Sequence, residues 1–133
     1  MRKIRNESGS VGVVLIFLVL FVWAGIASIL TVLASQYRAA SRVKASAAAL
    51  YVAEGGARRG LWELSRGHAG YAGESDLDVG VASVETKSED GRIFVVATGY
   101  VPDKKHPRAT ETIRIEAVKD KSGVYRTAAW QRL

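Results

Sequence analysis

The sequence predicts an α+β protein in which one long N-terminal helix, half transmembrane and half amphipathic, packs on a small antiparallel sheet of three or four strands. Three observations support this fold class. Residues 8–37 form an uncharged, mostly aliphatic run of 30 residues. No proline occurs before Pro102, so nothing interrupts a helix from Ser10 to about Ser65. The rest of the chain alternates apolar and polar residues in short segments, a pattern typical of β-strands.

The uncharged run is long enough to cross a membrane. About 20 apolar residues in a helix span a bilayer core, and residues 11–34 are almost wholly aliphatic. A core helix of a small soluble domain has a polar face, whereas only Ser28 and Thr31 interrupt this segment. We therefore expect residues 10–37 to form a single transmembrane segment in contact with the lipid bilayer.

The formal net charge of +6 belongs to the N-terminal half of the chain. Residues 1–66 hold nine basic and three acidic side chains, whereas residues 67–133 hold ten of each. Basic residues before the apolar run favour a cytoplasmic N-terminus, which predicts an inner-membrane protein with residues 38–133 in the periplasm. Because residues 67–133 are neutral overall, no nucleic-acid partner is expected. The absence of cysteine excludes a lipoprotein anchor, a disulfide and a thiolate metal site.

Residues 1–9 form a short basic leader. A secretory signal peptide has an apolar stretch of about 7–15 residues before its cleavage site, and the stretch here is far longer. Two interpretations remain: an uncleaved anchor, or a leader that is cut before the apolar run. A cut between Gly9 and Ser10 suits the second, because glycine lets a peptide lie extended in a protease. The alternative cut is between Gly12 and Val13.

Residues 38–66 are expected to form the amphipathic outer half of the helix. Apolar and small residues at steps of three and four predict one stripe that faces the sheet. Its members are Ala40, Val43, Ala47, Leu50, Glu54, Ala57, Leu61 and Leu64. Gly55 and Gly56 cost about 1 kcal/mol each in a helix, so they are its expected weak point.

Residues 67–133 are expected to form a small antiparallel β head. His68–Gly80 predicts a loop, and strands are expected over residues 79–87, 92–101, 109–118 and 124–130, with a turn at Asp90-Gly91. So small a sheet cannot bury an apolar face alone, so the outer helix is its expected partner. The predicted helix–sheet core comprises Leu50, Leu61, Leu64, Ile93, Val95, Ile113 and Ile115.

The basic leader, the aliphatic run and the block ALYVAEGG at 49–56, followed by LWEL at 61–64, resemble the PilX-type minor pilins of type IV pili. The resemblance covers the N-terminal half of the chain. It implies a pilin-like fold, cleavage by a prepilin peptidase, methylation, and contacts with other pilin subunits through the N-terminal helix. It also implies an inner-membrane assembly platform as partner and a role in priming or capping a pilus, a secretion pseudopilus or a competence filament.

One position departs from the pattern of major pilins. Most of them carry a glutamate at the fifth residue of the mature chain, which pairs with a neighbour's N-terminal amine. After a cut at Gly9 that position is Val14. A buried carboxylate is favourable only when it is paired, and minor pilins at filament tips also tend to lack this acid. The resemblance therefore implies a priming subunit rather than a bulk pilin.

The other polar clusters of the sequence are expected to be ordinary surface features. Glu74, Asp76, Asp78 and Glu85 match a calcium-loop spacing, but its turn glycine is misplaced, so a solvated acidic loop is expected. His68 and His106 belong to no catalytic set, so no enzyme activity, metal or cofactor is predicted. Lys104, Lys105 and Arg108 form a basic loop, and Glu54 could pair with Arg58 one helical turn later. Four aromatic residues are expected at the core or the domain edge: Trp62, Tyr100, Tyr125 and Trp130.

Two alternatives to a filament subunit remain at this point. One is a single-pass, membrane-anchored periplasmic domain with a binding role. The other is a DNA-binding minor pilin of an uptake system, in which the basic loop would contact DNA.

Overall fold

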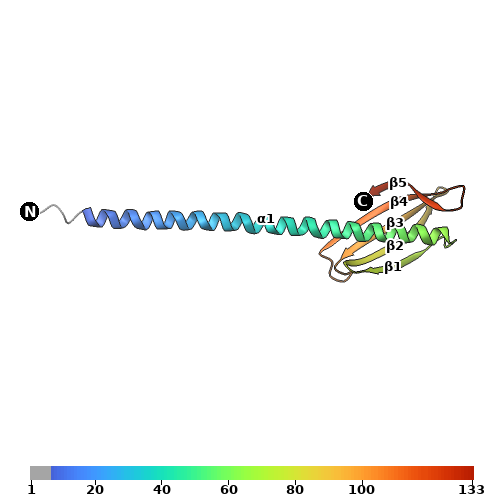
Figure 1. Ribbon diagram of the computed structural model, residues 1–133, viewed down its shortest axis with the longest axis horizontal. Helices are drawn as coiled ribbons and strands as arrows, with labels where there is room; N and C mark the ends of the chain where they lie inside the picture. The colour runs from blue at the N-terminus through green and yellow to red at the C-terminus, as the bar shows by residue number, and fades with distance from the viewer. Residues whose placement is uncertain (1–6) are drawn as a thin grey trace, which may run out of the picture. The chain divides into compact units, whose positions relative to one another are not determined.

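The computed structural model describes residues 7–133, so residues 1–6 of the predicted leader lie outside it. The predicted fold class is confirmed: one long N-terminal helix precedes an antiparallel sheet, in a pilin-like α+β layout (Figure 1). The sheet has five strands rather than three or four. The elements are α1 (Glu7–Ser65), β1 (Ala72–Leu77), β2 (Gly80–Glu89), β3 (Arg92–Val101), β4 (Ala109–Lys119) and β5 (Tyr125–Arg132).

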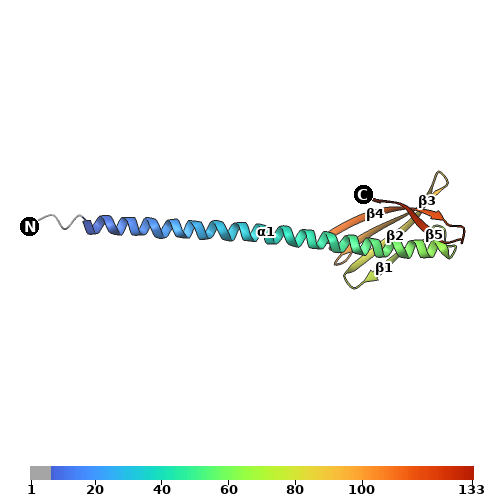
Figure 2. The ribbon, with the colours of Figure 1, turned by 45° about the horizontal axis from the view of Figure 1, so that its top comes forward.

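The chain divides into two compact units, and α1 contributes to both. The first unit ends at Ala40, and in its described part every residue from Gly9 onward is helical and exposed. The second unit, Ser41–Leu133, contains the rest of α1 and the whole sheet, and we call it the head unit. Figure 1 and Figure 2 show the strands beside the C-terminal part of α1, which is drawn in green.

The helix ends in a Schellman motif. The His68 amide donates to the Glu63 carbonyl at 3.1 Å, and the Gly67 amide donates to the Leu64 carbonyl at 3.0 Å. Gly67 has a φ of 90°, a backbone conformation that glycine adopts at little cost. This short sequence signal, a glycine after the last apolar residue, therefore fixes where α1 stops and the sheet begins.

The prediction of a loop over His68–Gly80 is wrong, because β1 lies within it. β1 pairs antiparallel with β2 at the edge of the sheet. Its outward side chains are polar, and Leu77 is its only large apolar residue, so the alternation that marks a strand is weak. Pairing with β2, rather than its own apolar pattern, makes this segment a strand.

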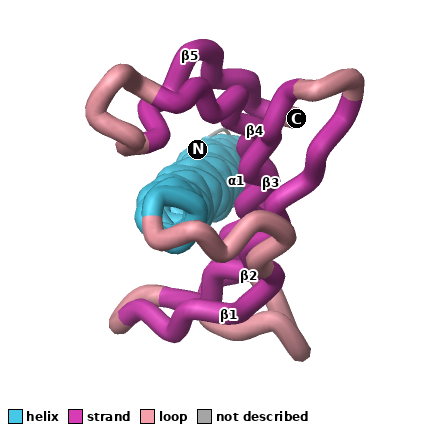
Figure 3. Tube along the Cα trace, turned by 90° about the vertical axis from the view of Figure 1, so that its right-hand side faces the viewer, coloured by secondary structure: helices cyan, strands magenta, loops and turns pink. Residues whose placement is uncertain are grey.

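The sheet is built from consecutive hairpins in the order β1-β2-β3-β4-β5. The predicted turn at Asp90-Gly91 joins β2 to β3, and both residues have positive φ, as a tight hairpin turn requires. Figure 3 shows the sheet curved around α1, with β1 and β5 on opposite sides of the helix.

The helix and the sheet approach each other through small residues. A Cβ added to Gly56 would lie 2.7 Å from the Cβ of Ala82, and one added to Gly60 would lie 2.7 Å from Cγ1 of Val95. On the sheet side, a Cβ on Gly99 would overlap the backbone of α1 at Ala49. These glycines therefore allow a contact distance that larger side chains would prevent.

Candidate membrane anchor and assembly surfaces

The N-terminal part of α1 is a candidate membrane anchor. Among residues 7–133, α1 is the one helix long and apolar enough to cross a bilayer, judged by length and composition. Its few hydroxyl groups bond to their own backbone: Ser28 donates to the Ala24 carbonyl at 2.9 Å and Thr31 to the Ala27 carbonyl at 2.8 Å. Their protons are satisfied within the helix, which lowers the cost of placing them in lipid.

The residues of the predicted processing sites all lie within α1. Helix α1 begins at Glu7, before the Ser10 start that the sequence predicts. Nothing outside the neighbouring backbone of α1 lies within 4 Å of a Cβ built on Gly9 or Gly12, so no other part of the described chain packs against either glycine. Cleavage at either position stays a prediction. Val14, the fifth residue after the predicted cut at Gly9, is 62% exposed.

The structure brings the seven predicted core residues together in the head unit. Four of them (Leu64, Val95, Ile113 and Ile115) are buried in one apolar cluster. The other three (Leu50, Leu61 and Ile93) are partly buried and pack against that cluster. The cluster also contains five residues outside the predicted core set: Ala53, Ala57, Val84, Ala97 and Ala117.

The buried face of α1 is rotated from the predicted stripe. Four residues outside the predicted stripe are buried: Ala49, Val52, Ala53 and Gly56. Of the predicted members, Ala57 and Leu64 are buried and Leu50 and Leu61 pack against the core, whereas Ala47 is exposed. Ala40 and Val43 lie in the stretch 9–44, which is exposed on every side. The prediction assigned the buried face from the large apolar side chains. The face of α1 that contacts the sheet carries mainly small side chains, because the sheet lies too close to the helix axis to leave room for leucines in the middle of that face.

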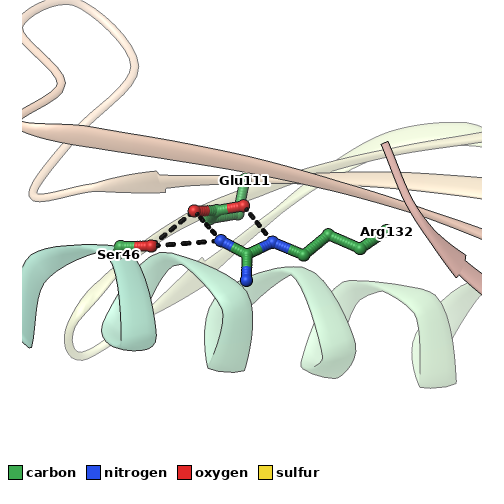
Figure 4. A network of polar contacts seen from close by, with 3 residues as sticks. All are labelled: Ser46, Glu111 and Arg132. Atoms are coloured by element: carbon green, nitrogen blue, oxygen red, sulfur yellow. Dashed lines mark hydrogen bonds and ion pairs between the residues drawn. The ribbon is translucent and has the colours of Figure 1, made fainter. Parts of the chain in front are cut away.

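Ser46 on α1, Glu111 on β4 and Arg132 on β5 form a network of hydrogen bonds that we call the polar clamp (Figure 4). The Arg132 guanidinium on β5 donates to both oxygens of Glu111 on β4, with Nε–Oε2 at 2.8 Å and Nη2–Oε1 at 2.5 Å. Ser46 on α1 donates to Oε1 of the same carboxylate at 2.5 Å. The Arg132 and Ser46 hydrogen bonds lower the pKa of the Glu111 carboxyl and favour its charged form. No pattern in the sequence predicts this clamp.

The acidic segment 74–85 is a hairpin rather than a loop. Glu74 and Asp76 lie on β1, whereas Glu85 lies on β2 opposite Ala72. Glu74 is paired with Lys104 from the β3–β4 loop, and that carboxylate raises the pKa of Lys104. Within residues 7–133, no three His, Cys, Asp or Glu side chains converge in a way that would hold a metal ion.

The two histidines lie apart, and only His68 has a side-chain partner among the described residues. Its Nδ1 is 2.7 Å from Oε2 of the buried Glu63, an ion pair when the ring is protonated. The backbone amide of His106 donates to Asp103 at 2.7 Å, which lowers the pKa of that carboxyl. The pairing of Lys104 with Glu74 leaves two cations of the basic loop facing solvent: Lys105 and Arg108.

Two aromatic residues expected at the core or domain edge lie on the surface instead. Trp62 is 54% exposed and Trp130 is 48% exposed, whereas Tyr100 and Tyr125 are half-buried. Trp62 is stacked by Arg66, whose Cζ lies 4.5 Å from the ring centroid. The considered pair between Glu54 and Arg58 is not formed in this part of the chain, where neither residue makes an ion pair.

Comparisons of the chain with protein-family models, curated proteins and solved structures found no match. The proposed function therefore rests on the fold and its surfaces.

Proposed function

We propose that this chain is a membrane-anchored structural subunit of a filament, of the minor pilin or pseudopilin class. The observation that carries the proposal is the division of α1. One stretch of the helix is exposed and apolar on all sides, and a later stretch of the same helix forms the core of a small sheet. An exposed apolar helix of this length needs lipid or other apolar helices around it.

This organisation supports a role that alternates between two environments. In the inner membrane, lipid would surround the apolar segment, with the head unit in the periplasm. In a filament, the same segment would pack against the helices of other pilin subunits. Val14 in place of a glutamate supports a priming or capping position, because it offers no carboxylate to a neighbour's amine.

The proposal includes cleavage by a prepilin peptidase between Gly9 and Ser10. Mass spectrometry of the membrane-extracted protein should show loss of residues 1–9. Gly9→Leu should block the cut, while Gly12→Leu, a matched change in the same helix, should leave it in place. An intact N-terminus in the parent protein would contradict the pilin proposal and leave a plain anchored domain.

Topology gives a second, independent test. A reporter enzyme that works only in the periplasm, fused after Leu133, should be active, since the basic leader favours a cytoplasmic N-terminus. The same reporter fused directly after the leader, before the apolar segment, is the matched control and should be inactive. The reverse result would place the head unit in the cytoplasm and exclude an external filament.

A further inference from the structure

The face of α1 turned away from the sheet carries a basic and aromatic stripe. It consists of Lys44, Tyr51, Arg58, Trp62 and Arg66, which we call the helical stripe. Steps of seven and four residues place these side chains on one side of a helix. All five are exposed, with Tyr51 at 67%. Trp, Tyr and Arg are the side chains that most often dominate binding at protein interfaces.

The three cations of the helical stripe, Lys44, Arg58 and Arg66, make no ion pair within residues 41–133. Of the acids of α1 in the head unit, Glu63 is buried beside His68, and Glu54, one turn before Arg58, is half-buried and makes no ion pair with it. Arg59, next to the stripe, is held by its own sheet through a 3.1 Å hydrogen bond to Ser75. Within residues 41–133, Arg58 makes no ion pair.

The strand β1 offers a surface of opposite charge. Glu74 and Asp76 occupy alternate positions of β1, so they point to one side of the strand, and Asp78 follows in the turn before β2; all three are exposed. Glu74 is paired with Lys104, whereas in the described chain Asp76 and Asp78 have no ion-pair partner. β1 is also an edge strand, which leaves backbone donors and acceptors free on its outer side.

We propose that the helical stripe of one copy of this chain binds the β1 edge of a second copy. The inference rests on the proposed filament function and names the contact between subunits. Charge supports it: within residues 41–133, Arg58 and Arg66 are exposed cations without an ion pair, and Asp76 is an exposed acid on β1 without an ion pair.

The two surfaces differ, so the contact is heterologous. Each copy keeps a free stripe at one side and a free β1 edge at the other after binding, and further copies add in the same direction. Such addition produces an open array or a ring. Single-stranded DNA is the less favoured occupant, because the stripe lies on a convex helix and the exposed acids of β1 would repel phosphates.

Self-association of the full-length chain in detergent micelles, measured by sedimentation, tests the proposal. Arg58→Glu and Asp76→Arg should each weaken association about tenfold or more, because each places like charges face to face. A one-to-one mixture of the two variants should restore it, since each contact between one variant and the other pairs opposite charges. Lys121→Glu, on the exposed turn before β5, is the matched charge-reversal control and should change nothing.

Several outcomes would overturn the contact. The first is a parent chain that stays monomeric in this assay, and the second is a pair of charge reversals that leave association unchanged. The third is a mixture that stays dissociated although both variants unfold at the same temperature as the parent. Each of these results would rule out the proposed contact. Binding of a fluorescent single-stranded oligonucleotide that Arg58→Glu abolishes would assign the stripe to nucleic acid instead. Cleavage after Gly9, measured on the same variants, separates this result from the proposed function, because it does not depend on the head contact.

Discussion

Two adjacent glycines of α1 provide a direct test of how closely the helix and sheet pack. Replacing glycine by alanine within a helix stabilises it by about 1 kcal/mol. At Gly55 the new methyl would meet only Cδ1 of Leu77 at 3.2 Å, and the end of a leucine side chain can rotate away. At Gly56 it would meet the Cβ of Ala82 at 2.7 Å and Cγ2 of Val84 at 3.0 Å, and Ala82 has no rotamer to change.

Gly55→Ala should therefore be neutral or stabilising, and Gly56→Ala should destabilise the head unit, since overpacking a core costs about 1–3 kcal/mol. The helix-propensity term is the same for both variants, so the difference between them measures the packing term alone. For a unit of this size, each kcal/mol shifts the melting temperature by about 4–8 °C.

Thermal unfolding of the full chain in detergent, followed by near-ultraviolet circular dichroism, gives the comparison. Equal melting temperatures, or a higher one for Gly56→Ala, would refute the close approach of helix and sheet.

Two further predictions concern the core and the clamp. Leu64→Ala should destabilise the head unit by about 2–5 kcal/mol because it leaves a cavity in the core, whereas Leu133→Ala, at a 63% exposed position, should have little effect on the same thermal unfolding. The clamp lowers the pKa of the Glu111 carboxyl in the folded state, so the charged carboxylate stabilises the fold. This stabilisation is complete above the usual carboxyl pKa of 4.5. It is lost as the pH falls through the lowered pKa that Glu111 has in the folded chain. Glu111→Gln should therefore be less stable than the parent at pH 7 but lose less stability on acidification, and an unchanged slope of stability against pH would contradict this role.

The sequence was sufficient for the class of fold but not for the orientation of the helix. The strands β3 and β4 have a strong local signal, a clear alternation, and the structure has them within a residue of the predicted bounds. The uncharged run lies in α1, the one helix of residues 7–133 that is long and apolar enough to cross a membrane. β1 lacks such a signal because an edge strand with outward acids resembles a loop. The clamp joins Ser46 to Glu111 across 65 residues, and no local pattern marks side chains that meet only in the folded chain.

The rotation of the buried face has a functional consequence. Large apolar and aromatic residues usually identify the core side of a helix, but Tyr51 and Trp62 of α1 are 67% and 54% exposed, whereas Ala49 and Ala53 are fully buried. The sheet instead contacts alanines and glycines, which bring the strands close to the helix axis. Close packing on that side leaves Tyr51 and Trp62 on the outside, next to arginines. A helix that packs its small residues on its own sheet therefore exposes its largest side chains, and these are the residues of the proposed contact.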